Sequence, residues 1–171
     1  MATKELSNEF MQQVAKDAAW KSLSFDFSWS ETLLEKYQDK VDWNEISSNS
    51  EIQWTIPMIR KFKRRINWHL FSDLSNDELF TESVIEAFKD NWDWHVLSGN
   101  SRIDFSEEIF DKFLDRWDWN EIVKRYDHVV FGIYFFERYK DYIPVSTLQE
   151  SCLWRGIVME MNKHLIEEIT A

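Results

Sequence analysis

A tryptophan that returns every 25 or 26 residues constrains the fold more than any other feature of the chain. Trp43, Trp68, Trp94 and Trp119 are separated by 25, 26 and 25 residues. Val145 holds the same place in a degenerate fifth copy, and Trp20 in a worn first copy. Such a period is typical of repeat proteins, in which each short unit buries its core against its neighbours.

A second aromatic column runs in phase with the first and comprises Trp29, Trp54, Phe80, Phe105 and Phe131. The first four members are followed by residues whose hydroxyl can cap a helix, namely Ser30, Thr55, Thr81 and Ser106. Apolar residues then recur three and four positions apart, as in Leu34, Tyr37 and Val41. This spacing places them on one helix face, so we predict a helix A of about three turns in each unit.

A shorter helix B is predicted to begin at each motif tryptophan. The preceding residues are Asp42, Asn67, Asp93, Asp118 and Pro144, four of which are strong N-caps. Glu45 and Glu121 stand three residues after their caps, at the spacing of a capping box. Neither helix is long enough to be stable alone in water, so stacking must supply the missing burial.

These patterns predict an all-α fold, a right-handed α-solenoid of five to six helix-pair repeats in one domain over residues 1–171. The repeats occupy about 29–149, between a cap helix at 6–20 and a C-terminal cap helix at about 153–169. Three glycines and two prolines leave little material for other folds. The apolar residues expected to face inward are Phe10, Met11 and Val14 in the first cap and Ile157, Met161, Leu165 and Ile169 in the second.

A resemblance supports the repeat prediction. Helix A ends in aromatic-x-Asp-x-aromatic-Asp-Trp, and a serine and an asparagine follow, as in Ser98 and Asn100. Over residues 29–149 this pattern resembles short tryptophan-containing α-helical tandem repeats of uncharacterised bacterial and large-DNA-virus families. Asn49 matches the terminal asparagine, whereas Leu74 and Arg125 depart from it. The resemblance implies a helical repeat fold and no particular activity.

Charge and composition limit the partners. The net charge of −11 repels nucleic acid and favours a protein partner with a basic surface. The N-terminus has no signal-peptide pattern, no segment is apolar enough to cross a membrane, and the lone Cys152 has no disulfide partner. We expect a cytoplasmic protein, with self-association left open.

No catalytic constellation is evident in the sequence. The motif tryptophans are expected to pack in the core, and His69 and His95 to be solvated on helix B, with His128 and His164 isolated. Stacked helices lie too far apart for these histidines to share a zinc ion. Cys152 lacks a histidine pattern that would activate it. We therefore expect no enzymatic activity, no metal and no cofactor.

Acidic residues form two columns on helix A. Glu35, Glu86 and Asp111, joined by Glu137, make the first, and Asp39, Asp90 and Asp115, joined by Asp141, make the second. A column of like charges at stacking distance is usually a solvated face. The six residues Glu35, Asp39, Glu86, Asp90, Asp111 and Asp115 are the predicted partner-binding face.

One unit inverts this charge. Arg60 and Arg64 replace the acids, and Lys61, Lys63 and Arg65 stand beside them. In one interpretation Arg60 lies between Glu35 and Glu86, and Arg64 between Asp39 and Asp90, as ion-pair ladders. In the other, all five bases form an anion site, since arginine suits bidentate contact with phosphate or carboxylate.

Two functions follow from these patterns. The first is an acidic protein-interaction module, such as a stoichiometric inhibitor or an immunity-type protein, that binds a basic surface. The alternative is a binding protein for a nucleotide-like or other anionic small ligand at residues 60–65.

Overall fold

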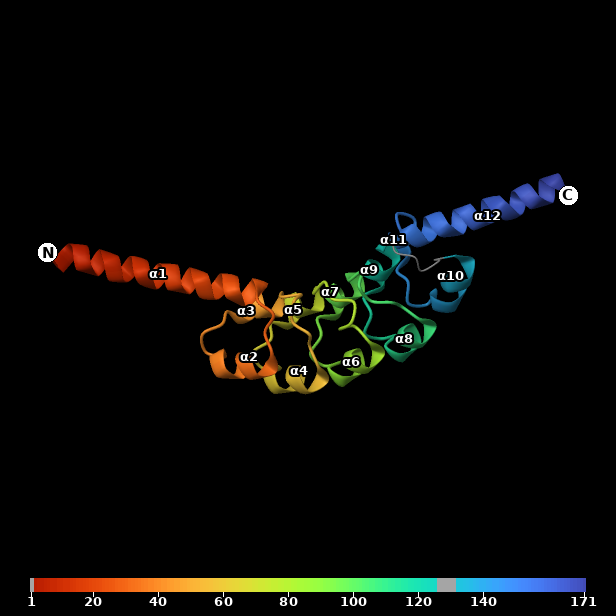
Figure 1. Ribbon diagram of the computed structural model, residues 1–171. Coiled ribbons are helices and arrows are strands. Elements are labelled where there is room, and N and C mark those ends of the chain that lie inside the picture. Colours follow the sequence, from red (N-terminus) through yellow and green to blue (C-terminus); the bar gives the residue numbers. More distant parts are fainter. Residues whose placement is uncertain (1, 126–131) are drawn as a thin grey trace. The chain divides into compact units, whose positions relative to one another are not determined.

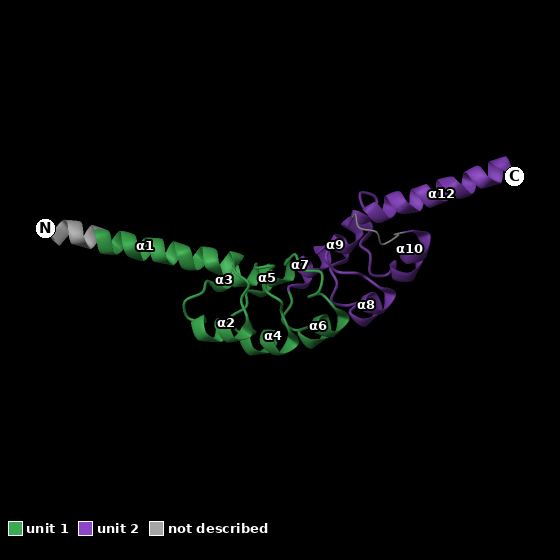
Figure 2. Ribbon diagram, in the orientation of Figure 1, with its two compact units in different colours: residues 1–92 green, residues 93–171 purple. Residues whose placement is uncertain are grey.

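The computed structural model describes residues 2–125 and 132–171, with the side chains of these ranges from residue 8 onward. These residues form twelve helices and no strand, so the predicted all-α class is confirmed (Figure 1). We predicted one domain, and the chain divides into two compact units, Met1–Trp92 and Asp93–Ala171 (Figure 2). The predicted Phe131 and His128 lie outside the described residues.

Each of the two compact units contains several copies of the predicted repeat, a pair of helices A and B. Unit 1 contains α1 (Ala2–Asp26), α2 (Glu31–Tyr37), α3 (Trp43–Ser47), α4 (Ile56–Phe62), α5 (Trp68–Ser72) and α6 (Glu82–Ala87). Unit 2 contains α7 (Trp94–Gly99), α8 (Glu107–Lys112), α9 (Trp119–Lys124), α10 (Ile133–Tyr139), α11 (Val145–Leu148) and α12 (Cys152–Thr170). The A helices are α2, α4, α6, α8 and α10, and the B helices are α3, α5, α7, α9 and α11. Successive B helices contact one another within each unit, and α1 contacts α3 in the same way.

The predicted caps start the A helices. Ser30, Thr55, Thr81 and Ser106 each accept the backbone N–H three residues further on. The N-cap of α10 is instead Gly132, which has no side chain to offer. The Ile133 N–H donates to the Glu160 carboxylate at 2.9 Å, so α12 supplies the cap that the local sequence lacks.

The A helices are shorter than predicted, because the chain turns after six or seven residues. In α2 the backbone N–H groups of Lys40 and Val41 both return to the Tyr37 carbonyl, which closes a tight turn. Val41 is 8% exposed, so the turn keeps it in the core that the longer helix was expected to line.

The motif tryptophan seals this turn. The carbonyl of Gln38, left without a helical partner, accepts a hydrogen bond of 2.8 Å from the Trp43 indole. The same bond runs from Trp68 to Lys63 at 2.9 Å and from Trp119 to Leu114 at 3.1 Å. Trp119 is buried as predicted, whereas Trp43, Trp68 and Trp94 are half-buried.

A buried serine joins α1 to α3, α3 to α5 and α7 to α9. The Ser47 hydroxyl donates to the Trp43 carbonyl at 2.6 Å and accepts the backbone N–H of Asn67, the N-cap of α5, at 2.9 Å. The same 2.9 Å bond links Ser24 with Asp42 and Ser98 with Asp118. Residues 20–26 of α1 therefore take the place of a B helix before α3, as the worn copy at Trp20 predicted.

This serine bond makes the capping-box prediction wrong. In a capping box the glutamate would accept the N-cap N–H, but the N–H groups of Asp42 and Asp118 donate to serine. Glu45 instead pairs with Lys21 at 3.3 Å, and Glu121 with the neighbouring Lys124.

Arg125 performs the task that asparagine performs elsewhere. The buried Asn49 amide donates to the carbonyls of Ser24 at 2.8 Å and Phe27 at 2.9 Å. In unit 2 the Arg125 guanidinium reaches the Ser98 carbonyl at 3.5 Å and the Ile103 carbonyl at 3.3 Å. It also lies 4.4 Å from the centre of the Phe105 ring, and burial lowers its pKa to about 10. A departure from the repeat pattern thus preserves the contact.

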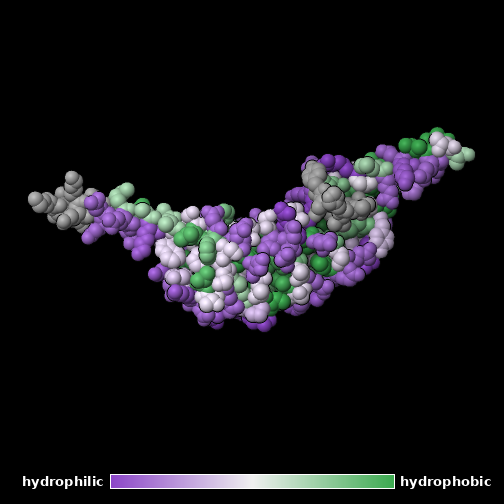
Figure 3. Space-filling model, in the orientation of Figure 1, coloured by the Kyte–Doolittle hydropathy of each residue, from purple (hydrophilic) through white to green (hydrophobic). Residues whose placement is uncertain are grey.

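Both terminal helices form, but their apolar residues do not face inward. Phe10, Met11 and Val14 of α1 are 67, 61 and 45% exposed. In α12, Met161, Leu165 and Ile169 are 47, 48 and 83% exposed, and Ile157 is half-buried. Figure 3 shows hydrophobic residues at the surface of both helices. Only the inner ends of α1 and α12 pack on their own units, which is why the prediction of closing caps fails. None of the helices in the described ranges has the length and hydropathy needed to cross a bilayer.

Candidate functional site

An ion-pair ladder joins α2 to α4 in unit 1. The Lys61 ammonium lies 3.0 Å from the Glu31 carboxylate and 2.8 Å from that of Glu35. Arg65 lies 2.7 Å from Asp39 and also donates to a backbone carbonyl of the preceding turn. The hydrogen bonds to Glu35 and Glu31 raise the pKa of Lys61.

The ladder that we predicted through Arg60 and Arg64 is therefore wrong by one residue. Successive positions on an α-helix are turned by about 100°, so the side chains that face the preceding helix are Lys61 and Arg65. Arg60, Lys63 and Arg64 project elsewhere, are exposed, and make no ion pair within the described residues.

The same ladder recurs between α8 and α10 in unit 2. Arg138 contacts Asp111 at 2.5 Å and Glu107 at 3.8 Å. The Arg138 hydrogen bond is the main cause of the lowered pKa of Asp111, and the Tyr139 hydroxyl also donates to this carboxylate. Relative to their helix starts, Lys61 and Arg138 occupy equivalent positions, and so do the carboxylates that they contact.

The six predicted acidic residues therefore differ in their surroundings. Glu35, Asp39 and Asp111 lie in ladders, with 55, 79 and 44% of their side chains exposed. Glu86 pairs with Lys89 of its own turn at 2.9 Å. Asp90 is exposed, and Asp115 is exposed without an ion pair in the described residues. The structure does not bring the six into one cluster; they form part of the outer surface of each unit.

Polar contacts also run along the B helices. Asn67 donates to the Asn44 side chain at 2.8 Å, and Thr147 to Asn120 at 3.1 Å. His95 is bonded at 2.7 Å to Asp118, the N-cap of α9. This bond raises the pKa of His95. The histidine of α7 therefore has a hydrogen-bond partner at the start of the next B helix.

Within the described residues, no group of three His, Cys, Asp or Glu side chains is placed to hold a metal ion. The half-buried Cys152 thiol donates to the Lys124 carbonyl at 3.3 Å.

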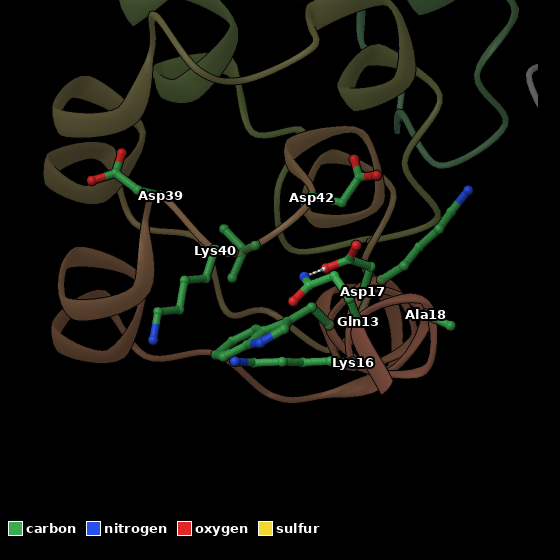
Figure 4. Close-up of a pocket in the computed structure, with 10 residues that line it drawn as sticks. Gln13, Lys16, Asp17, Ala18, Asp39, Lys40 and Asp42 are labelled. Atoms are coloured by element: carbon green, nitrogen blue, oxygen red, sulfur yellow. Dashed lines mark hydrogen bonds between the residues drawn. The ribbon is translucent and has the colours of Figure 1, made fainter. Parts of the chain in front are cut away.

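The sequence reasoning missed a groove between α1 and the turn after α2. It measures about 650 Å³, and Lys16, Trp20 and Lys40 are among the residues that line it. In Figure 4 the side chains of Asp39 and Lys40 diverge, and Lys40 extends toward the side where Lys16 lies. Lys40 occupies the ladder position of Arg65, ten residues after the cap, and this equivalence was the signal available in the sequence.

Comparison of the chain with protein-family models, with curated proteins and with solved structures finds no match.

Proposed function

We propose that the chain is a protein-interaction module whose exposed carboxylates on the A helices bind a basic partner surface. The observation that supports this proposal is the exposure of these carboxylates where they already pair within the fold. Glu35 and Asp39 each keep one oxygen that is bonded to neither Lys61 nor Arg65. A cationic side chain of a partner fits against such an oxygen without breaking the ladder.

Unit 2 carries slightly more than half of the chain's net charge of −11. Residues 93–171 include fifteen acidic and nine basic residues, a formal charge of −6. Glu108 lies beside the ladder and is exposed, and hydrogen bonds from its own backbone N–H and from Ser106 lower its pKa, which keeps it ionised. A field of one sign steers a basic partner and increases its association rate. A stoichiometric inhibitor or an immunity-type protein uses such a surface to cover a basic site.

The test compares acid and base variants in the capture of a partner from native cytosol. The acid variant combines Glu108→Gln with Asp115→Asn, because neither residue makes an ion pair in the described residues. The matched control combines Arg60→Gln with Arg64→Gln. We expect a basic protein that wild type and control retain, that salt releases, and that the acid variant binds about tenfold more weakly. Equal binding by the acid variant would contradict the proposal.

The unpaired bases support a second candidate. Arg60, Lys63 and Arg64 lie three and four residues apart, so they share one side of α4 and its following turn. A small anion such as phosphate or a nucleotide fits between such groups. Thermal denaturation with inorganic phosphate and with nucleotides tests this candidate, because a ligand that binds only the native state raises the melting temperature. An equal shift in the Arg60→Gln, Arg64→Gln variant would rule the site out.

A further inference from the structure

Within the described residues of unit 1, no A helix precedes α2. Residues 20–26 of α1 take the place of a B helix, with Trp20 packed 5.5 Å from Tyr37 and Ser24 bonded to the N-cap of α3. The residues before Trp20 continue as one straight helix and do not fold back as an A helix. The groove of Figure 4 lies nearby, between α1 and the turn that follows α2.

In unit 2 an A helix, α8, does precede the next A helix, α10, and its contacts show what this position buries. Phe110 of α8 lies over Trp119, Phe135 and Tyr139, with ring centres 5.8, 5.3 and 5.5 Å away. These three residues are 6, 7 and 2% exposed. The preceding A helix therefore buries a small surface made by a motif tryptophan and two residues of the next A helix. We call this surface the seat.

The equivalent seat before α2 consists of Trp20, Leu33 and Tyr37. Relative to the helix caps, Leu33 and Tyr37 match Phe135 and Tyr139, and Trp20 contacts Tyr37 as Trp119 contacts Tyr139, at 5.5 and 5.2 Å. All three residues of this seat are half-buried, whereas their counterparts are buried. The seat is apolar, formed and only partly covered.

Beside this seat lie the basic residues of a ladder without the carboxylates that would pair with them. Lys36 and Lys40 stand six and ten residues after the cap, where Lys61 and Arg65 stand in α4. Both lysines are exposed, and neither makes an ion pair within the described residues; Lys40 lies only over the Trp20 and Tyr37 rings. In both complete ladders the first position pairs with carboxylates on the preceding A helix, and in the ladder of unit 1 the second position pairs with Asp39 in the turn after that helix.

We propose that this open side of α2 is a docking site for an amphipathic helix of a protein partner, with an apolar side chain flanked by carboxylates. The pattern follows from the ladders: an aromatic or aliphatic residue enters the seat, and acids at positions i and i+4 face Lys36. A further acid at i+8 faces Lys40. This site is separate from the acidic surface proposed above. It selects an acidic helix, whereas that surface selects a basic partner.

A synthetic helix taken from the chain itself is the test probe. The peptide has the sequence of residues 104–119, which includes Glu107, Phe110, Asp111 and Asp115, and a hydrocarbon bridge between positions 112 and 116 holds it helical. At roughly 100° per residue, these two positions lie about 60° or more from each of the four docking residues, so the bridge leaves the docking face free. Binding to the full chain is measured by calorimetry and by chemical shifts of the lysine side chains.

We expect saturable binding, with the largest shifts at Lys36 and Lys40. The variant Lys36→Glu, Lys40→Glu should bind about tenfold more weakly, and a peptide with Glu107→Lys and Asp111→Lys should restore binding to that variant. The acid variant Glu108→Gln, Asp115→Asn should bind the peptide as wild type does, which separates this site from the proposed function.

Three outcomes would overturn the proposal. Absence of binding at millimolar peptide would show that the seat accepts no helix. Equal binding to the charge-reversed chain would place the peptide elsewhere. Self-association of the wild-type chain that Lys36→Glu, Lys40→Glu abolishes would assign the site to a second copy rather than to a partner. Both variants alter exposed residues only, and circular dichroism checks that they fold.

Discussion

The hydroxyl of Ser47 accepts the backbone N–H of Asn67 at 2.9 Å while it donates to the carbonyl of Trp43 at 2.6 Å. A hydroxyl offers one donor and two acceptor sites, so one small side chain satisfies a carbonyl of α3 and the N-cap N–H of α5. The start of α5 therefore depends on α3, and the same bond makes α3 depend on α1 and α9 on α7.

Removal of this hydroxyl should destabilise unit 1. In Ser47→Ala the Asn67 N–H loses its partner beside a fully buried side chain, which costs roughly 1–3 kcal/mol of the free energy of unfolding. Urea denaturation measures the change. Ser50→Ala is the matched control, because Ser50 is exposed, and it should change the free energy little. Equal effects of the two substitutions would contradict the role of Ser47.

Arg125→Ala should destabilise unit 2 by roughly 1–3 kcal/mol, because the carbonyls of Ser98 and Ile103 lose their donors. Lysine lacks the planar guanidinium with which arginine reaches two carbonyls at once. Arg125→Lys should therefore recover only part of the loss. Thermal and urea unfolding measure both variants. Full recovery by lysine would show that charge alone matters at this position.

The pair of His95 with Asp118 should make stability depend on pH. The bond raises the pKa of His95 above its ordinary value of about 6.5, so its contribution is complete below about pH 6.5 and is lost as the pH rises through the raised pKa. NMR titration should show a lower His95 pKa in Asp118→Asn, a variant that keeps a competent cap, as Asn67 demonstrates. An unchanged titration would exclude the bond.

The ladders predict different effects for neighbouring bases. Lys61→Gln removes a contact with two carboxylates and should lower the melting temperature at low ionic strength, with the difference reduced in high salt. Arg60→Gln removes an unpaired charge from among other bases and should leave the melting temperature unchanged or raise it. The opposite order would restore the ladder that we first predicted.

The exposed apolar residues of α1 should contribute little to stability. Phe10→Ser and Val14→Ser should leave the free energy of unfolding nearly unchanged, because both side chains are exposed. Leu34→Ala, at a fully buried position, should cost about 2–5 kcal/mol. A large loss from Phe10→Ser would indicate that α1 closes the stack after all.

The helix starts were predictable because capping is local. A serine or threonine bonds an N–H three residues away, so Ser30 and Thr55 reveal their helices within a few positions. The repeat period likewise located the motif tryptophans. The serine bond was missed because Ser47 and Asn67 are twenty residues apart, although the recurrence of serine four residues after Trp20, Trp43 and Trp94 was visible.

The candidate site was only partly predictable. The columns identified which residues recur but not the direction in which each side chain points, so Arg60 was chosen where Lys61 faces the acids. Amphipathic spacing placed Val14 on a helix face, yet spacing cannot tell whether another element covers that face. The partial exposure of Trp20 and Leu33 became apparent only by comparison with their buried counterparts in unit 2.

Amide hydrogen exchange at Asn67 tests the central claim most directly, namely that a buried serine hydroxyl of one B helix holds the start of the next. In the wild-type chain the Asn67 N–H should exchange slowly, and in Ser47→Ala its protection should fall much more than that of Phe71 inside α5. Rapid exchange of Asn67 in the wild-type chain, or equal protection in both proteins, would contradict the claim.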